Sequence, residues 1–164
     1  RTELTCPITA EAEALQKYGL DWTRFYIPAP LAVVFPLCAD DVVSLVKFAN
    51  RHGLALVPSG GRTGLSGGAV ANNGELVVSF EKMNKILDYE PVDQCVVLQP
   101  GVITQQLQAF AEAHDCLYPV DFASSGSSQI GGNIATNAGG IKVLRYGLTR
   151  DWVAGLKVVT GTGE

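Results

Sequence analysis

The positions of hydrophobic residues along the chain predict helices and short strands in alternation. Over 42–49, apolar residues recur every three or four positions, which gives a helix one apolar face. Asp40 or Asp41 is the expected N-cap of that helix, and Gly53 is its expected end. Further helices are predicted over 10–18, 104–114 and 131–138.

Short apolar runs between these helices predict buried strands. The run 54–57 leads directly into a glycine-rich loop. The run 153–159 alternates imperfectly and is also expected to be a strand, with no partner strand after it. The other expected strands are 32–35, 76–80 and 95–99. Strands that alternate with helices indicate an α/β or α+β layered architecture.

Composition and charge narrow the class of protein. Hydrophobic residues make up 47% of the 164 residues and charged residues 17%, which excludes a disordered chain. The net charge of -4 provides no basic field for a phosphate backbone, so no nucleic-acid partner is expected. No run reaches the roughly 18 apolar residues that span a bilayer, and residues 1–7 lack an apolar signal core. We therefore expect a globular, cytoplasmic protein with no membrane span.

Cysteine and histidine suggest little metal or redox chemistry. No two of the four cysteines form a close C-x-x-C pair, so free and mostly buried thiols are expected. His52 and His114 lie near predicted helix ends, where a cation complements the helix dipole. The sequence therefore predicts no metal site.

Glycine is concentrated in two windows. Of the 18 glycines, seven lie in 53–74 and six in 126–147. The first window holds a loop of small residues with one cation, Arg62, and the hydroxyls of Thr63 and Ser66. Successive backbone N–H groups in such a loop form a concavity that binds anions, and an arginine adds charge-assisted hydrogen bonds. The loop therefore predicts a diphosphate ligand, and a flexible turn with a solvated arginine is the alternative.

The second loop, 124–140, carries almost no charge but many neutral hydrogen-bonding groups. This composition suits a large, flat, polar heterocycle better than a second phosphate. A nucleotide P-loop is excluded because Gly132 stands where that motif needs lysine after Gly131. The dinucleotide fingerprint G-x-G-x-x-G has no match between a strand and a helix.

Together the two loops resemble a known family. The stretch PSGGRTGLSGG at 58–68, then PVD at 119–121 and IGGNIATNAGG at 130–140, is similar to the FAD-binding domain of the vanillyl-alcohol oxidase superfamily. Within it, the chain most resembles the D-2-hydroxy-acid dehydrogenases, a family that includes glycolate oxidase, D-lactate dehydrogenase and D-2-hydroxyglutarate dehydrogenase. The resemblance covers nearly the whole chain. It implies an α+β fold with FAD between two lobes, here 1–74 and 75–164, the second incomplete.

The resemblance also assigns residues to the cofactor. It implies that the first loop wraps the FAD pyrophosphate, through Ser59, Gly60, Gly61, Arg62, Thr63, Gly64, Ser66 and Gly67. It implies that the second loop lines the path from adenosine to isoalloxazine, through Ser127, Ser128, Gly131, Gly132, Thr136, Asn137 and Gly140. Many relatives attach FAD through a histidine of the first loop, but neither loop contains histidine or cysteine. FAD is therefore expected to bind noncovalently.

Members of this family continue past the equivalent of Glu164 with a further flavin loop and a substrate domain that bears a catalytic histidine and often metal ligands. The resemblance therefore implies a fragment of an enzyme that oxidises a D-2-hydroxy acid to a 2-oxo acid and passes electrons to an acceptor. The fragment alone is expected to contain no catalytic residue, to be inactive, to hold FAD weakly and to dimerise through the open edge of 153–159. The alternatives are another flavin oxidase or reductase of the same fold, and a nucleotide-binding module without redox chemistry.

Overall fold

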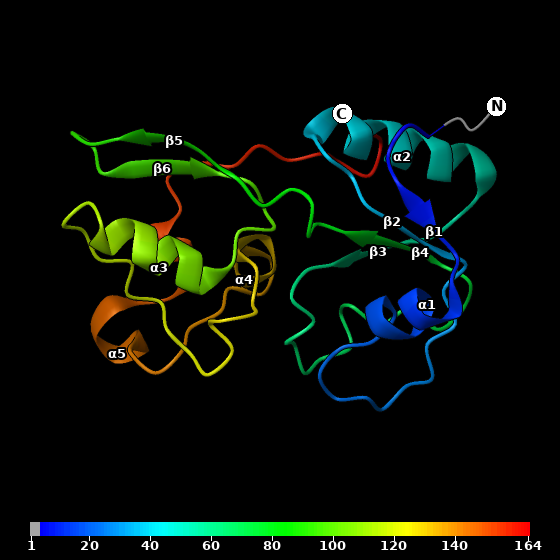
Figure 1. Ribbon diagram of the computed structural model, residues 1–164, viewed down its shortest axis with the longest axis horizontal. Helices are drawn as coiled ribbons and strands as arrows, with labels where there is room; N and C mark the ends of the chain where they lie inside the picture. The colour runs from blue at the N-terminus through cyan, green and yellow to red at the C-terminus, as the bar shows by residue number, and fades with distance from the viewer. Residues whose placement is uncertain (1–3) are drawn as a thin grey trace. The chain divides into compact units, whose positions relative to one another are not determined.

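The computed structural model describes residues 4–164, which fold into two compact units (Figure 1). Unit 1 comprises the chain up to Met83 together with Lys157–Glu164, and unit 2 comprises Asn84–Leu156. Each unit combines helices with its own sheet, which confirms the α+β class.

Unit 1 is built on a four-stranded sheet in the order β1-β2-β4-β3. Its strands are β1 (Ile8–Thr9), β2 (Ala32–Val34), β3 (Leu56–Ser59) and β4 (Leu76–Ser79). The strand β4 pairs in parallel with both β2 and β3, whereas β1 pairs antiparallel with β2. Because β4 lies between two strands of unit 1, that unit extends beyond residue 74, where the sequence places the boundary.

Helices α1 (Ala12–Tyr18) and α2 (Ala39–His52) cover opposite faces of this sheet (Figure 1). Successive side chains of a strand point to opposite faces, so β2, β3 and β4 each contribute to two clusters. On the side of α2, Leu45 packs with Cys6, Ala32, Val34, Leu76 and Val78. On the other side, Tyr18 of α1 packs with Val33, Phe35, Ala71 and Val77. Burial of both faces explains why these strands appear in the sequence as uninterrupted apolar runs.

The beginning of α2 differs from the prediction, and its end confirms it. The N-cap is Cys38, so the proposed cap at Asp40 or Asp41 is wrong. Both aspartates lie in the first turn, where negative charge favours the helix dipole. Asp41 reaches back to accept a hydrogen bond from the N–H of Leu37 at 2.9 Å. Gly53 ends the helix in the left-handed conformation with a φ of 63°.

Unit 2 joins one hairpin to several short helices. Its strands β5 (Ile86–Glu90) and β6 (Cys95–Leu98) pair antiparallel with an irregularity between Ile86 and Asp88. Its helices are α3 (Thr104–Glu112), α4 (Ile130–Thr136), α5 (Val143–Tyr146) and the 3-10 helix η1 (Thr149–Trp152). The core consists of Val102, Leu107 and Ile130, which hold α3 and α4 together.

The predicted strand over 153–159 is wrong. This segment lies outside every strand of residues 4–164, and Leu156 and Val158 are 62% and 64% exposed. A strand requires a neighbour to complete its hydrogen-bond ladder, and imperfect alternation alone does not supply one. Dimerisation through an open strand edge at 153–159 is therefore no longer expected.

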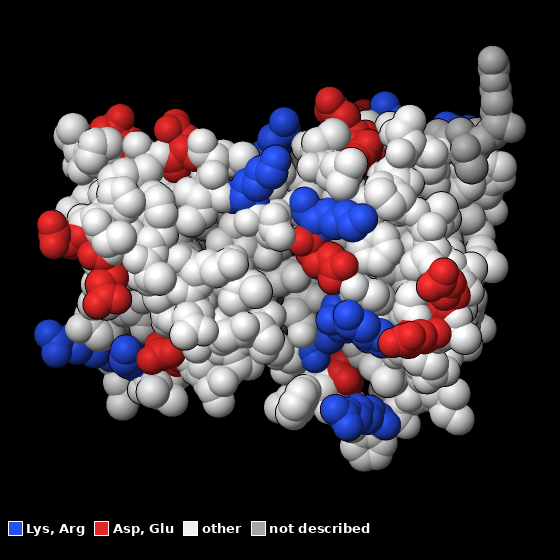
Figure 2. Space-filling view, viewed as in Figure 1, with Lys and Arg blue, Asp and Glu red and all other residues white. Residues whose placement is uncertain are grey.

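Several chemical features were also expected from composition. All four cysteines are free as predicted, but Cys38 and Cys95 are exposed rather than buried. Residues 4–164 contain no helix long and apolar enough to cross a membrane. They also contain no group of three or more His, Cys, Asp or Glu side chains that could hold a metal ion. Basic and acidic side chains are interspersed on the face seen in Figure 2.

Candidate functional site

The first glycine-rich loop begins at the carboxyl ends of two parallel strands. Ser59 is the last residue of β3 and pairs with Ser79, the last residue of β4. Both side chains are fully buried, and neither hydroxyl oxygen has a hydrogen-bond partner among the described residues. Buried hydroxyls normally have a partner, and ligands of parallel sheets bind at this end of the strands. At this edge of the sheet, the two hydroxyls therefore remain available to a hydrogen-bond partner.

The backbone of the first loop leaves room around its glycines. A Cβ atom built on Gly64 or Gly68 would meet nothing within 4 Å. Arg62 and Gly67 adopt left-handed conformations, with φ of 56° and 79°. Since the protein itself does not fill the space beside these glycines, a ligand could approach the backbone closely there.

Arg62 is held beside the loop rather than extended into solvent. Its Nη1 donates to the carbonyl oxygen of Gly60 at 3.2 Å, and its guanidinium lies 4.6 Å from the centre of the Tyr18 ring. Tyr18 in turn donates to Oε2 of Glu81 at 2.6 Å. Burial and this hydrogen bond raise the pKa of Tyr18 to about 12, so the phenol remains a neutral donor. The arrangement places one fixed positive charge at the loop.

The other predicted residues of this loop differ in accessibility. Gly60, Gly61 and Thr63 are half-buried, whereas Ser66 is exposed. The N–H of Gly67 donates to Oδ2 of Asp21 at 2.9 Å and is therefore already used within the protein. The structure thus brings the predicted residues together at one strand end, with Ser79 and Asp21 added from elsewhere in unit 1.

Two buried polar side chains of the second loop bond to Thr104, the first residue of α3. Oγ of Ser128 lies 2.7 Å from Oγ1 of Thr104, and Nδ2 of Asn133 donates to the same Thr104 oxygen at 2.7 Å. All three side chains are buried. This network joins α3 to α4, so the hydroxyl of Ser128 has a structural partner whether or not a ligand binds.

Two predicted glycines of the second loop are required by close packing. A Cβ on Gly131 would lie 2.6 Å from Cβ of Pro100, and a Cβ on Gly140 would collide with the carbonyl oxygen of Asp121. Gly140 also has a φ of 89°, which disfavours other residues. By contrast, a Cβ on Gly132 would meet nothing within 4 Å. Of these three glycines, Gly132 alone leaves open space.

The remaining predicted polar residues of the second loop bond to backbone groups of unit 2. Oγ1 of Thr136 donates to the carbonyl oxygen of Gly132 at 3.0 Å, and Oγ of Ser127 donates to that of Ser124 at 3.4 Å. Asn137 caps α4 in a left-handed conformation and accepts from the N–H of Arg150 at 3.0 Å. Oε1 of the buried Gln129 has no partner among the described residues, and no motif in the sequence pointed to it.

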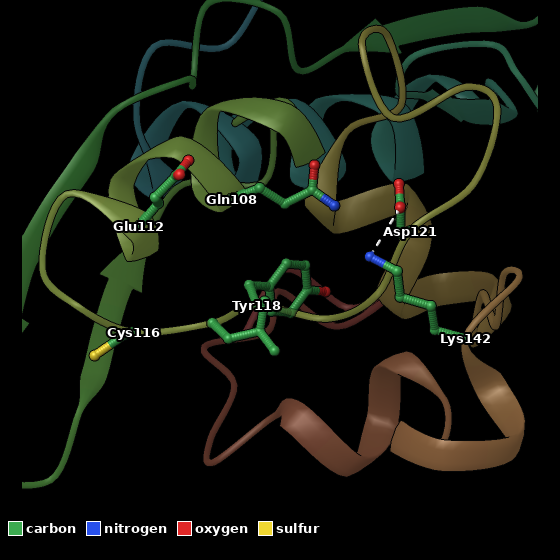
Figure 3. A pocket seen from close by; sticks show the side chains of 7 residues that line it. Gln108, Glu112, Cys116, Tyr118, Asp121 and Lys142 are labelled. Atoms are coloured by element: carbon green, nitrogen blue, oxygen red, sulfur yellow. Dashed lines mark ion pairs between the residues drawn. The ribbon is translucent and has the colours of Figure 1, made fainter.

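Unit 2 also contains a cavity of about 330 Å³ that no pattern in the sequence predicts (Figure 3). Its lining side chains are largely polar: Gln108, Glu112, Cys116, Leu117, Tyr118, Asp121 and Lys142. Nζ of Lys142 lies 3.2 Å from Oδ2 of Asp121, and Nε2 of Gln108 donates to the carbonyl oxygen of Val120. Burial raises the pKa of Tyr118. Only Asp121, within the Pro-Val-Asp motif, had any signal in the sequence.

Comparison with known proteins identifies the family to which the chain belongs. Residues 30–164 match the family described as FAD binding domain. The chain is 62% identical to D-2-hydroxyglutarate dehydrogenase of Stutzerimonas stutzeri over 157 residues, 96% of this chain and 34% of that protein. It is 42% identical to D-lactate dehydrogenase of Anaerostipes hadrus over 135 residues, 82% of this chain and 28% of that protein. The chain therefore spans about a third of the length of the curated relatives it matches.

The fold has solved counterparts. The structure of 6-hydroxy-D-nicotine oxidase from Arthrobacter nicotinovorans superposes with a TM-score of 0.82 at 22% identity, over 98% of this chain and 35% of that chain. At this identity the likeness shows the fold alone. It confirms the expected α+β fold, and the chain spans about a third of the length of that solved chain.

Proposed function

This chain belongs to the family of FAD-binding domains, and we propose that it is the flavin-binding part of a longer oxidoreductase, called the parent protein below. The parent protein oxidises a D-2-hydroxy acid to a 2-oxo acid and passes the electrons to an acceptor. The observation that carries this proposal is the 62% identity with a D-2-hydroxyglutarate dehydrogenase over 96% of the chain.

The first loop fits the diphosphate of FAD. The supporting features are the open glycines, the fixed charge of Arg62, and the buried Ser59 and Ser79 hydroxyls without partners. Small residues precede and follow Arg62 in the chain, and their backbone N–H groups are the donors that an anion-binding loop requires. These residues are Gly60, Gly61, Thr63, Gly64 and Ser66. We assign the pyrophosphate to residues 59–66, with Gly67 shaping the loop through its bond to Asp21.

The second loop fits an uncharged part of the cofactor. We assign direct contact to the open backbone at Gly132 and to the amide of Gln129. The other predicted residues support these contacts by holding the loop in place, because they are hydrogen-bonded or closely packed within unit 2. They are Ser127, Ser128, Gly131, Thr136, Asn137 and Gly140. In this proposal the first loop binds the charged diphosphate, and the second loop contacts an uncharged part of FAD.

FAD, when bound, supplies the acceptor for the hydride that leaves Cα of the hydroxy acid. The residues of this chain bind the cofactor and orient it. The base that takes the hydroxyl proton belongs to the rest of the parent protein, and the 164-residue chain alone is inactive and holds FAD weakly. Loss of much of the cofactor's contact area leaves the entropic cost of ordering it largely uncompensated.

Noncovalent attachment of FAD is part of the proposal. Neither loop contains a histidine or cysteine to which the flavin could be linked. Flavin should therefore remain in solution when the parent protein is precipitated with acid, and flavin that stays with the polypeptide would contradict this. The four free cysteines suit a reducing compartment, for which we propose the cytoplasm.

Purified parent protein tests the function directly. It should release stoichiometric flavin on denaturation and reduce a dye with D-2-hydroxyglutarate or D-lactate, with the L-enantiomers as controls. A parent protein without flavin would favour a nucleotide-binding module. Flavin without oxidation of any D-2-hydroxy acid would favour another flavin oxidase or reductase.

A further inference from the structure

The segment that follows α1 is bonded to the first glycine-rich loop at three points. The N–H of Trp22 donates to the carbonyl oxygen of Gly64 at 3.1 Å, and Gly19 accepts from the N–H of Ala71 at 3.0 Å. Between these two backbone bonds, Oδ2 of Asp21 accepts from the N–H of Gly67 at 2.9 Å. The middle connection is the one that depends on a side chain.

The carboxylate of Asp21 is buried, and both of its oxygens accept hydrogen bonds. It is 5% exposed, and its Oδ1 accepts from the N–H of Thr23 at 2.9 Å and from Oγ1 of Thr23 at 2.5 Å. Burial alone raises the pKa of this carboxyl, but the hydrogen bonds from Thr23 and Gly67 outweigh burial and hold the pKa below its usual value. The side chain is therefore ionised at neutral pH, and its hydrogen bonds are charge-assisted.

Besides the backbone bonds from Trp22 to Gly64 and from Val70 to Gly67, the Asp21 carboxylate is the side chain that holds the middle of the loop. A Cβ built on Gly64 or on Gly68 would meet nothing within 4 Å. Leu65, which follows Gly64, is 68% exposed. The conformation at Gly67, with a φ of 79°, is left-handed. While β3 anchors the beginning of the loop at Ser59, the Asp21 carboxylate anchors its far side.

We propose that Asp21 is a positioning residue for the cofactor: its carboxylate holds the first loop, through Gly67, in the conformation that receives the pyrophosphate of FAD. This inference rests on the proposed function. A loop held in its binding conformation pays less entropy when the ligand arrives. Because Oδ1 and Oδ2 are engaged by Thr23 and Gly67, the carboxylate acts through the loop and not by contact with the phosphates.

The test is Asp21→Asn in the parent protein. In asparagine an NH2 donor replaces one carboxylate oxygen, so the side chain cannot accept at both the position facing Thr23 and the position facing Gly67. Titration of the flavin-free protein should show FAD binding weakened roughly tenfold to a hundredfold, and ADP, which carries the diphosphate without the flavin, should weaken as a competitor by a similar factor. Asp40→Asn, an exposed acid in the first turn of α2, is the matched control and should change neither.

Amide hydrogen exchange separates positioning from general destabilisation. In Asp21→Asn, exchange over 64–70 should accelerate while exchange over 124–140 in unit 2 stays unchanged. Unchanged FAD affinity, or acceleration spread equally over both segments, would overturn the inference and leave the proposed function intact. An unsubstituted parent protein that does not bind FAD would instead overturn the proposed function.

A second variant covers the case in which Asp21→Asn does not fold. Thr23→Val removes the hydroxyl donor to Oδ1 and leaves the Gly67 bond in place. Because the carboxylate is then less firmly oriented, exchange over 64–70 should accelerate and FAD affinity should fall severalfold. No change in either measurement would overturn the inference.

Discussion

The two glycine-rich loops are alike in composition and different in physical design. In the first, a Cβ at Gly64 or Gly68 would meet nothing, and the loop is held by an ionised side chain from another segment. In the second, Gly131 and Gly140 touch Pro100 and Asp121 so closely that no larger residue fits. The glycines of the first loop leave open space beside the backbone, whereas two of those in the second are required by close packing.

The two loops also differ in whether their polar groups have hydrogen-bond partners within the protein. The first loop contains a fixed cation, and its strand ends carry two buried hydroxyls without protein partners among the described residues. Most of the predicted hydroxyls and amides of the second loop are bonded within unit 2. Substitutions in the second loop should therefore affect folding, and those in the first should affect ligand binding.

Gly140→Ala should give the largest effect. Its Cβ would collide with the carbonyl oxygen of Asp121, and the φ of 89° is strained for alanine. Overpacking costs about 1–3 kcal/mol and a left-handed residue about as much again, so the free energy of unfolding should fall by about 3–5 kcal/mol. Denaturant unfolding of this chain measures it. Gly132→Ala, in open space, is the control and should be neutral or slightly stabilising.

Thr104→Val should give the next largest effect. The substitution keeps the shape of the side chain but leaves Ser128 and Asn133 without their shared partner in a buried site. An unsatisfied buried polar group costs about 1–3 kcal/mol, so urea unfolding should show a loss of about 2–3 kcal/mol. In Thr136→Val, the lost bond is on an exposed side chain, and the loss should be much smaller. Equal losses in the two variants would contradict the structural role of the network.

Strongly patterned elements could be predicted from the sequence. Strands β2 and β4 are buried on both faces and therefore form continuous apolar runs, and Gly53 marks the end of α2 because a left-handed cap favours glycine. Strand β5 was missed because it includes Asp88 and Glu90 and is mostly exposed. The segment 153–159 has apolar residues but no partner strand, which its own sequence does not reveal.

The site was predictable to the extent that it is local. Glycines, hydroxyls and Arg62 lie together in the sequence, and their chemistry indicated a diphosphate. Asp21 is 46 residues from Gly67, and Ser79 belongs to another strand, so neither could be connected to the loop without the fold. The adjacent Gly131 and Gly132 also look the same in sequence, although only the first is closely packed.

Arg62→Ala tests the charge of the first loop. The loss of a charge-assisted hydrogen bond, about 1.5–3 kcal/mol, should weaken FAD binding to the parent protein roughly tenfold to a hundredfold. The stability of this chain should change little, because the guanidinium lies at the loop surface against the Tyr18 ring and the Gly60 carbonyl. Arg150→Ala, at an exposed position of η1 in unit 2, is the control. Unchanged affinity in Arg62→Ala would assign the diphosphate to backbone N–H groups alone.

The smallest expected effect is a difference in pH dependence between the two loops. The pKa of Asp21 is lower in the folded chain than its usual value of about 3.9, because hydrogen bonds from Thr23 and Gly67 outweigh its burial. A depressed carboxyl pKa stabilises the folded state above that usual value, and the stabilisation is lost as pH falls through the folded pKa. Unfolding free energies of the unsubstituted chain and Asp21→Asn should therefore differ at neutral pH and converge in acid. The deficit of Thr104→Val should not depend on pH, since its partners are neutral. If the Asp21→Asn deficit were equally constant, an ionised anchor in the first loop would be ruled out.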